Sequence, residues 1–203
     1  MQLNMQETFD KIKRSTGIIL GDIKGLILKP VPSLKNLRKR TPMETLLYSA
    51  IIIFIYSFGF AITTFYNLDT LRSFSFLAGF GLIEIFLIIY AIIWGSLIIN
   101  TLFLQIFVII VEGKRGLFET LKVIVYGGTP TYIFGWIPII GLLTGLWALI
   151  LEILAIRELH EISTGRAVIA MIMPYIIFLC LFISFTLMPA PVPLDEFLTL
   201  NLP

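Results

Sequence analysis

The chain has 203 residues, of which 58% are hydrophobic and only 14% are charged, whereas a soluble globular domain averages about 45–50% apolar and about 25% charged residues. Too few polar side chains are present to cover such a chain in water, so a soluble protein is excluded and an all-α, polytopic membrane helix bundle is predicted. The net charge of +2 indicates no nucleic-acid partner, and the single Cys180 and single His160 exclude a disulfide, a cysteine metal cluster and a His–His metal site, so no metal or cofactor is expected.

Residues 5–28 are predicted to form an amphipathic helix that lies along the membrane surface. Its apolar side chains recur at spacings of three and four residues, and its basic side chains lie largely off that stripe, where anionic headgroups are their expected partners. Three glycines are spaced by four residues: Gly17, Gly21 and Gly25. They either form a small-residue face for close helix contact or weaken the helix. Pro30 and Pro32 end it, within a cytoplasmic segment predicted over residues 1–42.

Five transmembrane helices are predicted within a domain over residues 43–188. The prediction is based on four apolar stretches, each long enough to cross the hydrocarbon core. These stretches are residues 46–66, 74–111, 123–151 and 167–194, and they contain one charged residue, Glu84. The two middle stretches are too long for one upright span, so each must be divided into two helices or be tilted. The predicted spans are at about residues 45–66, 81–111, 117–136, 139–160 and 167–188. Residues 189–203 form the predicted extracytoplasmic tail.

The starts and breaks of these helices have sequence signals. Thr41 and Glu44 can form a capping box around Pro42 at the start of the first span. The stretch over residues 74–111 has no internal proline and predicts one long tilted helix, with a re-entrant hairpin at residues 94–96 as the alternative.

A tight turn at residues 135–138 is predicted to divide the third span from the fourth, near one membrane surface. Trp136 prefers the interface, and Pro138 suits the start of the next helix. The opening turn of the third span carries Glu119 and Lys122, which are expected at the headgroups.

Kink-forming and small residues are expected to shape the bundle. Pro130, beside Gly127, predicts a bend in the third span, and Pro174 predicts one in the fifth. Such kinks free carbonyl groups that can line an ion pathway, although most only shape helix packing. Gly141 and Gly145 in the fourth span indicate close helix contact.

Two carboxylates lie inside the predicted spans, where an ionisable group is a candidate functional residue by default. Glu84 shares a helical face with small residues and is expected to point into the bundle, either as an ion, proton or headgroup site or as a carboxyl that fixes packing. Glu152 either serves such a site or reaches a cytoplasmic basic group. Asn100 and Gln105 are expected to form hydrogen bonds between helices.

His160 is expected in the last cytoplasmic turn of the fourth span, as a cation at the end of the helix dipole, with Gly165 ending the helix. The pair His160–Glu161 matches half of a zinc-protease HExxH motif, but Thr164 stands where the second histidine belongs. With no other catalytic motif in the chain, a non-enzymatic protein is predicted.

Basic residues give an independent test of the membrane topology, because cytoplasmic loops carry an excess of lysine and arginine. With five spans, fourteen of the fifteen Lys and Arg residues fall on one side and only Arg72 falls on the other. We therefore expect a multi-pass protein of the cell membrane with a cytoplasmic N-terminus and an extracytoplasmic C-terminus. The first apolar stretch follows about 43 polar-rich residues, so it is a retained span and not a signal peptide.

Residues 113–174 resemble the YIP (Ypt-interacting protein, Yip1 domain) family of membrane proteins. The residues that carry the resemblance are the Gly-Lys-Arg-Gly run at 113–116, Tyr126, Gly127, Pro130, Trp136, Pro138 and the run at 159–167. The five-span architecture is similar too. In eukaryotic relatives the resemblance implies Rab GTPase binding and early secretory traffic. The short N-terminal segment without an Asp-Leu-Tyr motif departs from that pattern and looks more like the prokaryotic branch, which has no settled function.

Two functions are consistent with these features. The first is a Yip1-like membrane protein that organises membrane or scaffolds partners, such as other membrane proteins or further copies of itself. The alternative is a small channel, ion-coupled transporter or lipid scramblase that uses Glu84 and also Glu152. The position of Glu84 discriminates between them, because transport requires it in a water-accessible cavity.

Overall fold

The computed structural model describes residues 5–66 and 79–186, with the side chains of the first helix described from Gly17 onward. Every regular element in these residues is a helix. The helices are α1 (Met5–Leu28), α2 (Pro30–Leu37), α3 (Pro42–Tyr66), α5 (Leu82–Ile110), α6 (Leu117–Gly127), α7 (Thr129–Phe134), α8 (Ile140–His160) and α9 (Thr164–Thr186). Of these, α3, α5, α8 and α9 are long and apolar enough to cross a membrane. The described part of the chain is therefore an all-helical, multi-pass membrane protein.

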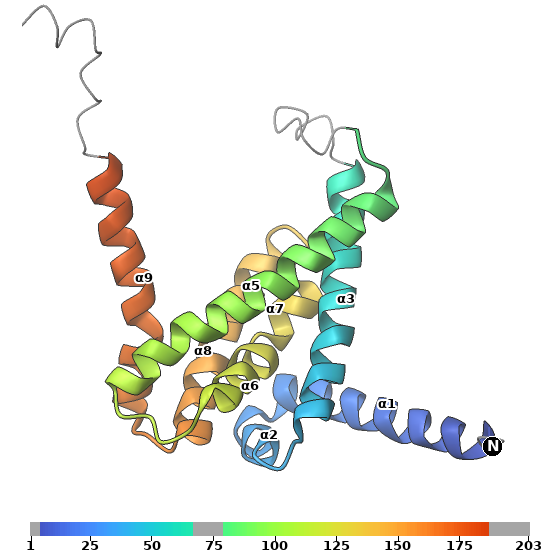
Figure 1. The fold of residues 1–203 in the computed structure, drawn as a ribbon, viewed down its shortest axis with the longest axis horizontal. Helices are drawn as coiled ribbons and strands as arrows, with labels where there is room; N and C mark the ends of the chain where they lie inside the picture. The colour runs from blue at the N-terminus through green and yellow to red at the C-terminus, as the bar shows by residue number, and fades with distance from the viewer. Residues whose placement is uncertain (1–4, 67–78, 187–203) are drawn as a thin grey trace, which may run out of the picture.

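The two upright helices α3 and α9 stand on opposite sides of the bundle, and α5 crosses obliquely from α3 to the lower part of α9 (Figure 1). Between them α6 and α7 run up and α8 returns. Four helix ends meet at the lower side, where α5 and α8 end and α6 and α9 begin, and α2 packs against α8 there. We call this region the α2 end; it comprises α2 and the loops at residues 111–116 and 161–163. The predicted tail and Arg72 lie outside the described residues.

The N-terminal helix α1 runs across the foot of α3, and its C-terminal half packs on the bundle (Figure 1). Leu26 is fully buried, and Ile19 and Ile23 pack against the same core. Because these three residues are spaced by four and three, they form one face of the helix. The apolar stripe of α1 is therefore partly used for contact with the protein itself.

The three spaced glycines of α1 do not form one packing face. Only Gly25 makes a close approach, to Ser33 of α2, where an added Cβ would lie 2.5 Å from the hydroxyl oxygen. An added Cβ at Gly17 or Gly21 would meet no heavy atom within 4 Å. The helix nevertheless continues through all three positions to Leu28, so neither of the two sequence-based interpretations holds along its whole length.

The start of α3 confirms the predicted capping box. The Thr41 backbone N–H donates to Glu44 Oε2 over 2.9 Å, and the Glu44 N–H donates to Thr41 Oγ1 over 3.3 Å. These two bonds satisfy donors that an uncapped helix end would leave free. Pro42 opens the helix, at a position where its missing N–H costs nothing.

The long helix α5 confirms the single helix predicted over about residues 81–111 and excludes the re-entrant hairpin at residues 94–96. The stretch over residues 74–78 lies outside the described residues. Helix α5 runs without interruption from Leu82 to Ile110 over 29 residues, which corresponds to about 43 Å at 1.5 Å per residue. That length exceeds a hydrocarbon core of about 30 Å, and the oblique path of α5 in Figure 1 accommodates it.

The predicted third span is two short helices instead of one bent helix. Helix α6 ends at Gly127, and α7 begins at Thr129 with Pro130 in its first turn, where proline is favoured. Gly128 between them is required by space, since an added Cβ would lie 2.6 Å from the Ile124 carbonyl oxygen. Neither α6 nor α7 alone is long enough to cross a membrane, so the described residues contain four candidate spans.

A tight turn joins α7 to α8, as the sequence predicts. Ile139 has a positive φ of 68° with ψ −54°, and an added Cβ on Gly141 would lie 2.6 Å from the carbonyl oxygen of Gly135. The ring of Trp136 packs directly on Gly59 of α3, leaving no room for a side chain there. The turn is thereby fixed against α3.

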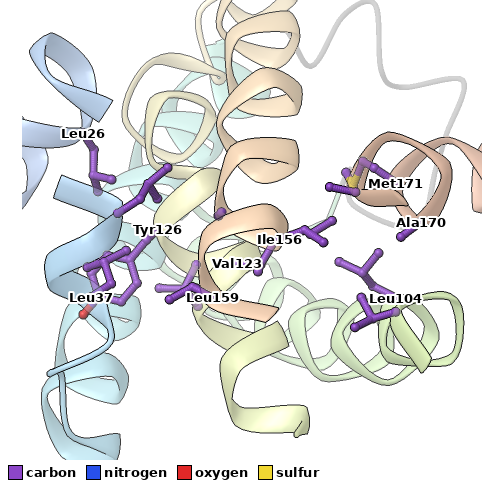
Figure 2. Close-up of a cluster of buried hydrophobic side chains, with 14 of the residues drawn as sticks. Leu26, Leu37, Leu104, Val123, Tyr126, Ile156, Leu159, Ala170 and Met171 are labelled. Atoms are coloured by element: carbon purple, nitrogen blue, oxygen red, sulfur yellow. The ribbon is translucent and has the colours of Figure 1, made fainter. Parts of the chain in front are cut away.

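The main buried core lies toward the α2 end, and seven helices contribute to it: α1, α2, α3, α5, α6, α8 and α9 (Figure 2). Its labelled side chains are Leu26, Leu37, Leu104, Val123, Tyr126, Ile156, Leu159, Ala170 and Met171. Because α1 and α2 are not candidate spans, burial of Leu26 or Leu37 removes apolar surface from water and contributes about 1.5–3 kcal/mol each. Between the spans, lipid is as apolar as leucine, so close packing and hydrogen bonds hold the helices together.

Candidate functional site

Two hollows meet at Glu152 in α8. The larger, of about 520 Å³, is lined by residues of α5, α6, α7, α8 and α9, including Asn100, Tyr132 and Tyr175. The second, of about 300 Å³, shares Tyr132, Glu152 and Tyr175 with the first and extends to Tyr56 of α3. We call the two together the Glu152 cavity. All four candidate spans contribute to its wall.

The cavity lies at a similar depth along each helix. Glu152 is eight residues before the end of α8, Asn100 is ten residues before the end of α5, and Pro174 is ten residues after the start of α9. At 1.5 Å per residue these positions are about 12–15 Å from the α2 end. That depth falls inside a hydrocarbon core of about 30 Å.

The carboxylate of Glu152 forms no hydrogen bond or ion pair among the residues that the structure describes. Arg157, the nearest basic residue along α8, contacts Glu158 at 2.7 Å instead. Asn100 donates from Nδ2 to the Ser96 carbonyl oxygen of its own helix over 2.8 Å, so it is not the interhelical link expected from the sequence. Glu152 is the one acidic residue among those that line the cavity.

Gly127 determines how closely α6 approaches α8 at this point. An added Cβ would lie 2.6 Å from Glu152 Cγ and 3.0 Å from both the Cα and the backbone nitrogen of Glu152. Gly145 of α8 lines the smaller hollow and would meet nothing within 4 Å, so the predicted packing role of the Gly141–Gly145 pair holds only for Gly141. Pro130 is buried beside the cavity, in the first turn of α7.

Glu84 does not point into the bundle as predicted. It is exposed in the first turn of α5, and an added Cβ at Gly81 would lie 2.7 Å from Glu84 Oε2. The free N–H groups and positive dipole of a helix start favour an anion at this place. Asn100, where α5 meets the cavity, is sixteen residues further on, about 24 Å along the helix. Glu84 and Glu152 therefore do not form one site.

His160 lies in the last turn of α8 as predicted, but its imidazole is fully buried. Its Nε2 lies 3.0 Å from Thr120 Oγ1 of α6, and the Thr120 hydroxyl donates to Gln105 Oε1 of α5. Because the hydroxyl has a single proton, Nε2 is the donor in this arrangement. A polar chain thus joins three helices, and the expected interhelical role of Gln105 is confirmed.

Helix α8 ends at His160, with Glu161 as its C-cap, and not at Gly165. Glu161 adopts the left-handed conformation that ends many helices, with φ 57°. Gly165 is the second residue of α9 instead. A left-handed conformation costs a side-chain-bearing residue about 1–2 kcal/mol, and the two arginines that contact the Glu161 carboxylate favour it at this position. Pro138 lies exposed in the turn at the other end of α8, where its carbonyl accepts the Ile140 N–H over 2.8 Å.

Ion pairs join separate segments at the α2 end. Glu161 Oε1 lies 3.2 Å from Arg38, the residue after α2, and 2.8 Å from Arg115 of the loop before α6. The hydrogen bond and charge of Arg115 hold the pKa of Glu161 below its usual value of 4.5. Arg166 of α9 pairs with Glu112 at 2.8 Å. Exposed pairs of this kind contribute little energy each. Together they hold three basic segments, which contain Arg38, Arg115 and Arg166, at one end of the bundle.

The N-terminal segment is also held through tyrosines and an ion pair. Tyr126 is buried and stacks on Tyr48 of α3 with ring centroids 4.3 Å apart, and the Tyr48 hydroxyl lies 2.8 Å from Thr129 Oγ1. Beneath them Asp22 of α1 pairs with Arg40 at 2.7 Å. Burial raises the pKa of Asp22, although the bond from Arg40 opposes this rise.

Lys122 is buried and not at the headgroups as expected. Its side chain is 2% exposed, and its Nζ lies 3.1 Å from Glu119 Oε1 and 4.9 Å from the centre of the Phe118 ring. A buried ammonium requires such partners, since desolvation of the bare charge is costly. The same turn of α6 therefore supplies the carboxylate and the ring that hold it.

The aromatic wall of the cavity has no signal in the sequence. Tyr56, Tyr132 and Tyr175 come from α3, α7 and α9, and no spacing connects them. Glu152 alone stands out, as a carboxylate in an apolar stretch. A search for tyrosines at a similar depth in other spans could have suggested the group.

Comparison with known proteins gives one match. The model of the Yip1 domain matches residues 24–185 of the chain. No curated protein matches, and no solved structure matches. The matched range includes α2 and all four candidate spans, so it covers the helices that form the Glu152 cavity.

Proposed function

The chain belongs to the Yip1 domain family, and from this premise we propose that it is a non-enzymatic protein of the cell membrane that organises lipid and scaffolds partners at its α2 end. The partners would be anionic lipid headgroups and other membrane proteins, including further copies of this chain. The observation that carries the proposal is that α1 and α2 are fixed to the bundle while four lysines in and beside them are exposed. A basic surface is thus held at a defined place instead of on a loose tail.

One side of the segment formed by α1 and α2 is held on the bundle by buried apolar side chains and by arginine contacts. Leu34 and Leu37 of α2 are fully buried, and Arg38 donates to the carbonyl oxygen of Glu158 in the last turn of α8. A cation suits that place because the last carbonyls of a helix lack partners within it. The segment therefore moves with the bundle.

The free side carries four exposed lysines: Lys24, Lys29, Lys35 and Lys39. Each lysine near an anionic membrane surface contributes about 1 kcal/mol of attraction, which is enough for lipid recognition when several act together. With a cytoplasmic α2 end, these lysines would face the leaflet and the partners of that side.

We further propose five crossings, by α3, α5, the α6–α7 pair, α8 and α9, with the N-terminus in the cytoplasm and the C-terminus outside. Residues 117–134 of the α6–α7 pair would extend about 27 Å if helical throughout, close to the thickness of the hydrocarbon core. The ion pairs of Glu161 and of Arg166 favour this membrane topology, because they hold three basic segments together at the α2 end, on one side of the membrane.

The transport alternative has no support in its original form. It needs Glu84 in a water-accessible cavity, and Glu84 is an exposed residue about 24 Å along α5 from the Glu152 cavity. A scaffold function does not require Glu84 to lie in a water-accessible cavity.

Replacement of the four exposed lysines by glutamine tests the lipid part of the proposal. The full-length protein and the variant would be purified from the same membranes, and the phosphatidylglycerol and phosphatidylcholine bound per protein would be measured by lipid mass spectrometry. We expect the variant to lose most of the bound phosphatidylglycerol and to keep its phosphatidylcholine. Equal amounts of phosphatidylglycerol on both proteins would contradict the proposal.

A further inference from the structure

We propose that the Glu152 cavity binds an organic ammonium ion, a single positive nitrogen carried on an apolar body, with the Glu152 carboxylate as its counter-ion. This inference is independent of the scaffold function. It rests on the lone carboxylate, the aromatic wall and the opening of the larger hollow.

The carboxylate of Glu152 has no cation near it in the described part of the chain. Arg157 is turned to Glu158 at 2.7 Å, and Lys122 is paired with Glu119 at 3.1 Å. An ionised carboxylate at membrane depth requires a positive partner to offset its lost hydration. A cationic ligand supplies that partner at the place where both hollows meet.

The wall favours an organic cation over a metal ion. Tyr132 and Tyr175 line both hollows beside Glu152, and Phe103 and Phe178 extend the larger one. Aromatic faces attract ammonium groups, and cages of aromatic rings are how proteins recognise quaternary ammonium. A metal ion of the hard type needs about six oxygen ligands, whereas a hollow of about 520 Å³ with a mainly apolar wall has room for a ligand of more than ten heavy atoms.

The larger hollow opens between α5 and α9 toward the surroundings of the bundle. Phe103 of α5 and Tyr175 and Phe178 of α9 all line it and are all exposed on the outer surface. At this depth the surroundings are lipid, so a ligand with an apolar body can enter sideways from the bilayer. Pro174 lines the same opening, at the position in α9 where the backbone hydrogen bond to Ala170 is missing.

Benzyltrimethylammonium and its neutral isostere neopentylbenzene are the probes that test this site. Binding to the full-length protein in maltoside micelles would be measured by titration calorimetry, for the unchanged chain, Glu152→Gln and Glu84→Gln. We expect the ammonium to bind at least ten times more tightly than the neutral probe to the unchanged chain. Glu152→Gln should lose that preference, and Glu84→Gln, the same charge change on an exposed residue, should keep it.

Three results would overturn the proposal: no binding of benzyltrimethylammonium by the unchanged chain, equal binding of the neutral probe, or unchanged binding in a folded Glu152→Gln variant. Folding of each variant is checked by gel filtration and helical circular dichroism. If Glu152→Gln does not fold, Tyr175→Leu decides, because this exposed side chain can change without disturbing the core. We expect Tyr175→Leu to weaken ammonium binding several-fold, and an unchanged affinity would equally overturn the proposal.

Discussion

Gly127 of α6 packs directly against Glu152 of α8, so closely that a Cβ atom at residue 127 would lie 3.0 Å from the Cα of Glu152. The contact is with backbone, which cannot move aside as the end of a flexible side chain can. It fixes the spacing of the two helices at the place where the larger hollow of the Glu152 cavity meets an ionisable group.

Gly127→Ala should therefore destabilise the bundle by about 1–3 kcal/mol, the usual cost of forcing an extra methyl into a closely packed contact. The measurement is the free energy of unfolding by dodecyl sulfate in mixed micelles. Gly145→Ala is the matched control, because an added Cβ there meets nothing within 4 Å. A stability of Gly127→Ala equal to that of the control would show that α6 and α8 can separate without cost.

Thr120→Val should cost about 1–3 kcal/mol, because it leaves Gln105 Oε1 and His160 Nε2 without the hydroxyl that both contact. Thr120→Ser keeps the hydroxyl and should lose much less. The same unfolding experiment compares the two variants. If valine were tolerated as well as serine, the polar chain through α5, α6 and α8 would have no part in stability.

Glu161→Gln should lower the melting temperature at neutral pH and have no effect in acid. The pKa of Glu161 is lower in the folded protein than its usual value of 4.5, so the unfolded chain takes up the proton first as the pH falls. The stabilisation from Arg115 is thus complete well above pH 4.5 and is lost as the pH falls through the folded-state pKa. Melting curves from pH 7 to about pH 3 should show the two proteins converging at the acid end.

Salt gives the control for this pair. Both partners are solvent-exposed, so at about 1 M salt, where screening acts within about 3 Å, the difference at neutral pH should shrink. A difference between Glu161→Gln and the unchanged chain that stayed constant with both pH and salt would assign the effect to helix geometry at Glu161, not to charge.

The membrane topology is tested by labelling introduced cysteines from each side of the membrane. In a Cys180→Ser background, Lys114→Cys and Ser163→Cys place thiols in the two loops of the α2 end, where both residues are exposed. We expect an impermeant maleimide to reach both thiols in inside-out vesicles only, and to leave them unlabelled in intact cells. A tag after Pro203 should be accessible in intact cells; access from the cytoplasmic side alone would exclude five crossings.

Local signals predicted the local structure well. The capping box of Thr41 and Glu44, the unbroken helix over residues 82–110 and the turn before α8 all appear where the sequence places them. Each depends on residues within a few positions of one another, so the chain itself contains the whole cause. The family resemblance is likewise confirmed, by the Yip1 domain match over residues 24–185.

Side-chain environments in the bundle could not be predicted in the same way. Glu84 was expected inside and is exposed, and Lys122 was expected at the headgroups and is paired within the protein. His160 lies at the helix end as expected, but it is buried there. In an apolar helix the hydrophobic pattern does not distinguish a lipid-facing side from a protein-facing side, because lipid and protein interior are equally apolar.

The sequence by itself determined that this protein lies in a membrane, which segments are apolar helices and where α3 and α5 begin, because these depend on composition and on neighbouring residues. Only the tertiary structure decided that Glu152 is the carboxylate at a cavity, with tyrosines from α3, α7 and α9 around it. The physical reason is that these residues meet through helix packing, and packing is determined by contacts such as that of Gly127 with Glu152, which lie 25 residues apart in the chain.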